Sequence, residues 1–230
     1  RDVAPSRGLG DVYKRQRQFD TKLIANLCGS TIEDYVEVAE ILGNKLDMFE
    51  LNISCPNVKE GGMAFGTDAK MIEEITSKVK AVSKVPLIVK LSPNVTDIAE
   101  MAKAAEAGGA DAISLINTLL GMKIDINTRR PVLNNNMGGM SGPAVMPVAV
   151  RMVYQVRQAV KLPIIGMGGI TTGEDAVEFL LAGADAVSVG TAGIVDPYAW
   201  IKVRNGINDY LDKNGYESVN DIVGKLEMNN

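Results

Sequence analysis

Short apolar, β-prone runs alternate with helical segments along most of this chain of 230 residues. The β-prone runs occur at residues 23–27, 47–54, 86–91, 112–117, 163–167 and 186–189. Helices are predicted over residues 30–42, 68–82, 94–107, 144–160, 172–181, 197–211 and 219–227. Ser30 is expected to cap the first helix, with Glu33 completing a capping box. Buried strands separated by helices predict a parallel sheet that is covered by helices.

Internal similarity indicates that one βα unit is repeated. The segments AEAGGADAISLIN and LLAGADAVSVG resemble each other, and so do SKVPLIVK and VKLPIIGM. This repetition, with polar residues at successive strand ends, favours a (β/α)8 TIM barrel. The alternative is a doubly wound open sheet, but no G-x-G-x-x-G motif follows the first strand. About six of the eight βα units of a barrel are recognisable, so an incomplete barrel is expected.

The first 16 residues differ from the rest of the chain. Residues 1–16 show neither helical nor strand periodicity, and DVYKRQ resembles translated library-adaptor sequence. We therefore expect residues 1–16 to be a non-native leader, with a disordered arm as the alternative. Residues 17–230 are predicted to form one barrel domain that lacks its first units. A content of 46% hydrophobic residues suits a domain with a sizeable core.

Composition disfavours several classes of partner. A net charge of −4 and an aromatic content of 5% argue against binding to nucleic acid. No apolar run approaches the roughly 20 residues that span a bilayer, so no membrane association is expected. The chain has no histidine and two widely separated cysteines. These features indicate a reducing cytoplasm and argue against a metal site.

Polar side chains gather at the predicted carboxyl ends of strands, where a barrel builds its active site. The segment ELNISCPN places Cys55 after one strand, as a candidate base or nucleophile or as a small buried side chain. Asn26, Asn52, Asn57 and Asn117 also follow strands. Their amides offer donors and acceptors that suit a planar heterocycle carrying C=O and N–H groups.

The last two strands end in sequences suited to a phosphate. Gly168, Gly169, Gly190 and Thr191 each lie between a strand and a helix. Glycines allow backbone N–H groups to approach an anion, and barrels commonly bind phosphate at these loops. Lys90 lies inside an apolar strand. It faces either the mouth, where it would stabilise negative charge on a ligand, or solvent.

Seven motifs in order resemble one family. These are ELNISCPN, VKEGGMAFGTD, VKLSPNVTDI, INT, GGMSGP, IIGMGG and SVGTA. They are similar to the class 1 dihydroorotate dehydrogenases from about Leu23 to the end of the chain. The resemblance implies an FMN-dependent (β/α)8 barrel that oxidises dihydroorotate to orotate in de novo pyrimidine biosynthesis.

The resemblance also implies roles for individual residues. Cys55 would remove a proton from C5 of dihydroorotate while a hydride passes from C6 to the flavin. The implied FMN-binding residues are Asn26, Asn52, Lys90, Ile116, Gly142, Gly168, Gly169, Gly190 and Thr191. The implied pyrimidine-binding residues are Asn52, Asn57, Asn117 and Thr118.

The loop NVKEGGMAFGTD resembles the NAD-linked type 1B enzymes more than the fumarate-using type 1A. The membrane-bound class 2 differs, because it has serine at the position of Cys55. Type 1B implies a partner subunit that carries FAD and a [2Fe-2S] cluster, around a homodimeric core of a heterotetramer. Two cysteines are too few for this chain to hold such a cluster itself.

The front of the chain departs from the family pattern, since about two βα units are expected before Leu23. We therefore expect a truncated chain that binds FMN weakly. Three alternatives stay open at this point. They are a barrel like that of dihydropyrimidine dehydrogenases, a non-catalytic barrel that binds a phosphate ligand, and an inactive fragment.

Overall fold

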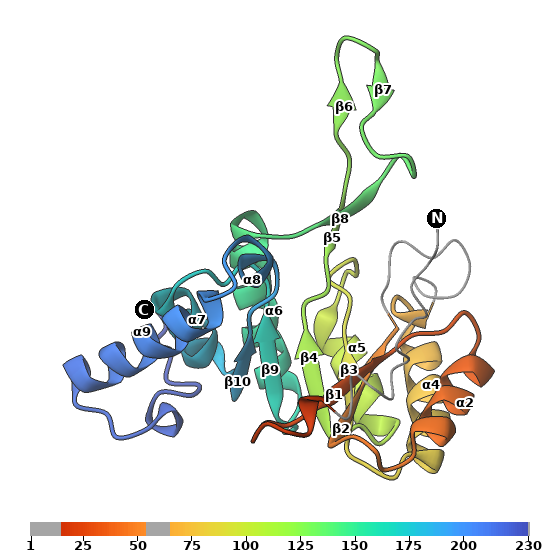
Figure 1. Ribbon diagram of the computed structural model, residues 1–230, viewed down its shortest axis with the longest axis horizontal. Helices are drawn as coiled ribbons and strands as arrows, with labels where there is room; N and C mark the ends of the chain where they lie inside the picture. Colours follow the sequence, from red (N-terminus) through yellow and green to blue (C-terminus); the bar gives the residue numbers. More distant parts are fainter. Residues whose placement is uncertain (1–14, 54–64, 230) are drawn as a thin grey trace.

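The computed structural model describes residues 15–53 and 65–229. Its centre is a six-stranded parallel sheet whose strands lie side by side in chain order (Figure 1). The strands are β1 (Ile24–Leu27), β2 (Met48–Asn52), β3 (Leu87–Lys90), β4 (Ala112–Leu115), β9 (Ile164–Met167) and β10 (Ala186–Ser188). The six predicted strands are confirmed as the six strands of this sheet.

The helices cover one face of this sheet. They are α2 (Ile32–Leu42), α4 (Ala69–Val82), α5 (Ile98–Ala107), α6 (Met146–Ala159), α7 (Gly173–Ala182), α8 (Thr191–Val195) and α9 (Ala199–Asn214). Neighbours in the outer layer touch in chain order, α2 against α4, α4 against α5, α5 against α6, α6 against α7 and α7 against α9. Within the described residues the sheet curls with β1 and β10 at its edges. This confirms the expected incomplete (β/α) barrel.

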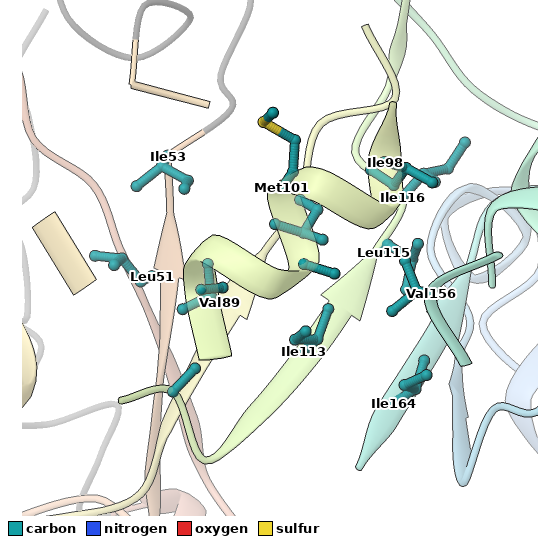
Figure 2. Close-up of a cluster of buried hydrophobic side chains, with 14 of the residues drawn as sticks. Leu51, Ile53, Val89, Ile98, Met101, Ile113, Leu115, Ile116, Val156 and Ile164 are labelled. Atoms are coloured by element: carbon teal, nitrogen blue, oxygen red, sulfur yellow. The ribbon is translucent and has the colours of Figure 1, made fainter. Parts of the chain in front are cut away.

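One row of neighbouring residues across the sheet belongs to the hydrophobic core between the sheet and the helices. Side chains in this row face the helices, and Figure 2 shows Leu51, Val89, Ile113 and Ile164 in one cluster with Met101 of α5 and Val156 of α6. The row consists of Leu27, Leu51, Val89, Ile113 and Ile164. All of them are buried. Burial of such side chains stabilises the fold by about 1.5–3 kcal/mol each.

The next register row lies on the opposite, concave face. It consists of Asn52, Lys90, Ser114, Ile165 and Ala186. Because successive side chains of a strand alternate between faces, Lys90 points away from the helices that cover Val89. This settles the orientation of Lys90 that the sequence left open. The polar side chains of this row, those of Asn52, Lys90 and Ser114, can form hydrogen bonds with a ligand on the concave face.

The cap of the first helix differs from the prediction by one residue. Thr31, not Ser30, is the cap, and its Oγ1 accepts a hydrogen bond of 3.2 Å from Asp34 N. The Asp34 carboxylate accepts from Thr31 N at 3.0 Å and so completes the capping box. Ser30 and Thr31 each have a carboxylate three residues further on, and in the structure the Asp34 carboxylate accepts from the backbone N–H groups of both.

Residues 118–142, between β4 and α6, form a protruding arm. In it β5 (Leu119–Gly121) pairs with β8 (Gly138–Met140), and β6 (Ile124–Asp125) pairs with β7 (Arg130–Pro131), both antiparallel. Figure 1 shows the arm extending away from the barrel body. Ile126 at its far end is 84% exposed.

The predicted helix over 219–227 is wrong. Only a single 3-10 turn, η2 (Val219–Asp221), forms there. Gly224 takes a φ of +69° and its N–H donates to Leu180 O at 2.9 Å, which ends the turn and ties the segment to α7.

A second 3-10 turn, η1 (Pro143–Val145), leads into α6. Among the helices of the described ranges, none has the length and apolar character to cross a membrane.

Candidate functional site

A cavity of about 200 Å³ opens at the carboxyl ends of β3, β4, β9 and β10. It brings together most of the residues that the sequence analysis predicted for a ligand site. These are Lys90, Ile116, Asn117, Thr118, Gly142, Gly168, Gly169, Gly190 and Thr191. They come from segments that are far apart in the chain, so the fold alone makes them neighbours.

A second cavity of about 400 Å³ adjoins the first. The two share Gly142, Gly169, Gly190 and Thr191. Together they reach the range of about 300–1,000 Å³ that is usual for small-molecule sites. Asp196 and Lys202 also line the second cavity, and the hydrogen bond of 2.6 Å between them is the main cause of the lowered pKa of Asp196.

The loop after β9 approaches the loop before α6 so closely that only glycine fits. Gly168 and Gly169 have φ values of +129° and +85°, which other residues rarely adopt. A Cβ on Gly169 would lie 2.8 Å from Gly142 O and 2.9 Å from Met146 Cβ. The backbone of both loops therefore forms the wall of the cavity.

At Gly142 and Gly190 this wall exposes backbone with no side chain over it. A Cβ built on Gly142 or Gly190 meets no atom within 4 Å. The Thr191 and Ser141 hydroxyls, 2.9 Å apart, join the two loops beside them. A bare backbone lining flanked by hydroxyls suits a bound phosphate group.

Three predicted amides form a continuous row on the concave face. Asn117 Nδ2 donates to Asn52 Oδ1 at 3.2 Å, and Asn52 Nδ2 donates to Asn26 Oδ1 at 3.1 Å. Asn26 Nδ2 in turn donates to Glu50 Oε2 at 2.6 Å. Asn117 also lines the cavity, so the row begins at the site and ends at Glu50.

Glu50 was not identified from the sequence. Its carboxylate accepts from Ser114 Oγ at 2.7 Å, and Lys90 Nζ lies 3.7 Å from Oε2. The side chains of Glu50 and Lys90 are 14% and 19% exposed. The sequence does indicate that Glu50 lies on the same face as Asn52, because the two are two residues apart in one strand. Further cavity residues that were missed are Met140, Ser141, Val145, Met167 and Ser188.

Two predicted residues, Cys55 and Asn57, lie outside the described residues. The other cysteine, Cys28, follows β1 and its Sγ lies 3.3 Å from Asn26 Oδ1. Cys28 therefore adjoins the amide row, and Tyr35 supports the row from behind by donating to Asn52 O at 2.8 Å.

The curled parallel sheet, its outer helices and the cavity at the strand ends define the class of (β/α)-barrel enzymes. The family model for dihydroorotate dehydrogenase matches residues 7–211. The chain belongs to the dihydroorotate dehydrogenase family, which is a family of oxidoreductases.

Relatives support the same placement. The chain is 62% identical over 211 residues to the catalytic subunit of dihydroorotate dehydrogenase B (NAD(+)) from Alkaliphilus oremlandii, covering 91% of this chain and 70% of the relative. It is 58% identical over 219 residues to the protein of that name from Bacteroides fragilis, covering 94% and 72%. These relatives confirm the resemblance to the NAD-linked type 1B catalytic subunit.

A solved structure agrees in fold. The dihydroorotate dehydrogenase of Eimeria tenella, crystallised with ferulenol, aligns with a TM-score of 0.78 at 23% identity. The alignment covers 94% of this chain and 64% of that one. The chain thus spans 64–72% of the length of these three proteins.

Proposed function

We propose that this chain is an FMN-binding catalytic subunit that oxidises dihydroorotate to orotate in pyrimidine biosynthesis. The observation that carries the proposal is the cavity at the strand ends. It places a bare glycine wall, Lys90 and Asn117 around one space. The glycine wall suits a phosphate group, and the Lys90 ammonium and the Asn117 amide suit a polar ring.

The residues present fit FMN. The wall formed by Gly142, Gly169 and Gly190, with the Thr191 hydroxyl, would hold the phosphate. Lys90 lies at the end of β3, where its ammonium would stabilise negative charge on the reduced ring. The remaining FMN contacts that we propose are those of Asn26, Asn52, Ile116 and Gly168. When bound, FMN supplies the acceptor for the hydride that leaves C6 of dihydroorotate.

The chain itself would supply the base and the groups that orient the substrate. In this proposal the Cys55 thiolate takes the proton from C5 of dihydroorotate. Asn52, Asn57, Asn117 and Thr118 would hold the pyrimidine through its alternating C=O and N–H groups. The amide row, which reaches the cavity through Asn117, gives the amides of Asn52 and Asn117 a fixed direction.

The relatives' name, catalytic subunit, indicates that they work with another subunit. For this chain we propose a partner that carries FAD and a [2Fe-2S] cluster and passes electrons to NAD. We further propose a homodimeric core of a heterotetramer, located in the cytoplasm. The assignment of residues 1–16 as a non-native leader and of 17–230 as the FMN-binding domain also remains a prediction.

The test is the protein purified from its complete reading frame. We expect bound flavin by absorbance, and dihydroorotate-dependent reduction of a dye acceptor. Cys55→Ser should keep the flavin and lose turnover by at least about a hundredfold, because a hydroxyl is a far weaker base than a thiolate. Cys28→Ser keeps a donor toward Asn26 and should retain most of the activity.

An orotate titration separates this function from that of a dihydropyrimidine dehydrogenase-like barrel. Orotate, which carries a carboxylate, should perturb the flavin spectrum if the pyrimidine site is that of a dihydroorotate dehydrogenase. Uracil should not. A protein that binds flavin but responds to uracil instead would reject the proposed substrate. A protein without flavin would reject the proposed cofactor.

A further inference from the structure

The Glu50 carboxylate is the end point of the amide row. Its Oε2 accepts from Asn26 Nδ2 at 2.6 Å, and its Oε1 accepts from Ser114 Oγ at 2.7 Å. Lys90 Nζ lies 3.7 Å from Oε2. Glu50 thus connects β1, β3 and β4 from its place on β2.

The Glu50 carboxylate sets the direction of the amides from one end of the row. A carboxylate can only accept hydrogen bonds, so Asn26 must turn its NH₂ group toward Glu50. Asn26 Oδ1 is then left to accept, and Asn52 Nδ2 donates to it at 3.1 Å. Asn52 Oδ1 accepts from Asn117 Nδ2 at 3.2 Å for the same reason.

The far end of the row is held by the backbone. Asn117 Oδ1 accepts from Thr118 N at 2.8 Å, which again requires Asn117 to present its NH₂ group to Asn52. The row is therefore fixed at both ends, by an N–H that can only donate and by a carboxylate that can only accept.

We propose that Glu50 is a positioning residue, which fixes the donor and acceptor edges that Asn26, Asn52 and Asn117 offer to ligands. In the same role it offsets the positive charge of Lys90 beside the cavity. The proposal rests on the function proposed above, since it concerns how that site forms hydrogen bonds with the flavin and the pyrimidine.

The decisive variant is Glu50→Gln, which keeps the size of the side chain and removes its charge. Glutamine has one acceptor oxygen in place of two, so it cannot accept from Asn26 and Ser114 at the same time, and the fixed acceptor at this end of the row is lost. We expect the dissociation constant of orotate to rise at least about tenfold and the flavin midpoint potential to become more positive. The potential rises because the Lys90 ammonium stabilises the reduced ring more strongly once the Glu50 charge beside it is removed.

A readout without ligand tests the row directly. In protein labelled with ¹⁵N-asparagine, the side-chain NH₂ signals of Asn26, Asn52 and Asn117 should all shift in Glu50→Gln. If only the Asn26 signal shifts, or if orotate affinity and flavin potential equal those of the wild type, the proposal is overturned. These amide signals remain informative if the wild type binds no flavin, in which case the proposed function fails separately.

Two further variants complete the design. Glu74→Gln removes a carboxylate from the exposed Glu74–Lys78 pair on α4 and should leave all three readouts unchanged. If Glu50→Gln does not fold, Asn26→Ala interrupts the row at an exposed position. The Asn52 and Asn117 signals should then shift, and unchanged signals would overturn the proposal.

Discussion

Asp111 and Leu87 hold each other through a reciprocal pair of hydrogen bonds at the amino ends of β4 and β3. Asp111 N donates to Leu87 O at 2.8 Å, and Leu87 N donates to Asp111 Oδ2 at 2.7 Å. Lys80 from the end of α4 also contacts this carboxylate. The start of one strand is thereby fixed to the start of the next and to the helix before them.

The same arrangement occurs at two other strand pairs. Asp47 exchanges hydrogen bonds with Leu23, and Asp185 exchanges them with Ile164. Each carboxylate again has a basic partner, Arg17 in the first case and Arg157 in the second. Asp111 and Asp185 are the aspartates of the repeated Gly-Ala-Asp-Ala segments. The internal similarity of the sequence therefore has a structural cause at the amino ends of the strands.

Asp111→Ala should lower the free energy of unfolding by about 1–3 kcal/mol, because it leaves the buried Leu87 N–H without its acceptor. The measurement is urea unfolding at neutral pH. Asp209→Ala, an exposed aspartate on α9, should change stability by less than about 0.5 kcal/mol. Ligand affinity should be unchanged in both, because the site lies at the opposite ends of the strands. Equal stability of the two variants would contradict the role of Asp111.

Thr76→Val should raise the free energy of unfolding by about 1 kcal/mol. Within the described residues, Thr76 Oγ1 is buried without a hydrogen-bond partner, and valine has nearly the same shape without the polar oxygen. Thermal unfolding would measure the gain. The same substitution at Thr172, whose Oγ1 accepts from Asp175 N at 3.2 Å at the start of α7, should instead lower stability by about 1 kcal/mol. A loss at both positions would show that the Thr76 hydroxyl is satisfied.

The sequence was sufficient for the order of the main elements. Buried strands need unbroken apolar runs, so all six strands were found within a few residues of their observed ends. The grouping of Lys90 with Asn117 and the terminal glycines also followed, because parallel strands bring their carboxyl ends to one edge. The arm was missed because its strands are only two or three residues long and show no clear alternation.

The role of Glu50 could not be read from the chain alone. Its partners Asn26 and Ser114 lie 24 and 64 residues away, and they meet only because of the register between four strands. A charged residue inside a strand indicates a special environment but does not name its partners. Whether Lys90 faces the cavity was undecided for the same reason, until the register row that it shares with Asn52 was known.

Asp34→Asn should destabilise the protein near pH 6 but not near pH 2. Backbone N–H groups of Ser30 and Thr31 donate to Asp34 and hold the pKa of its carboxyl below the usual value. A lowered pKa in the folded state stabilises the protein above the unfolded value of about 3.9, and this contribution is lost as the pH falls through the folded pKa. Urea midpoints between pH 6 and pH 2 measure the effect. Glu33→Gln, in the same turn of α2, is the matched control and should show a smaller pH-dependent difference.

Gly169→Ala should lose both stability and ligand affinity. Its φ of +85° is unfavourable for alanine, and the new Cβ would overlap Gly142 O at 2.8 Å. We expect a loss of about 1–3 kcal/mol in the free energy of unfolding and at least a tenfold weaker binding of FMN. Gly190→Ala separates the two effects, because its Cβ meets no atom within 4 Å and Gly190 lines the cavity. That variant should keep its stability and still bind FMN more weakly, whereas Gly193→Ala, outside the lining, should change neither.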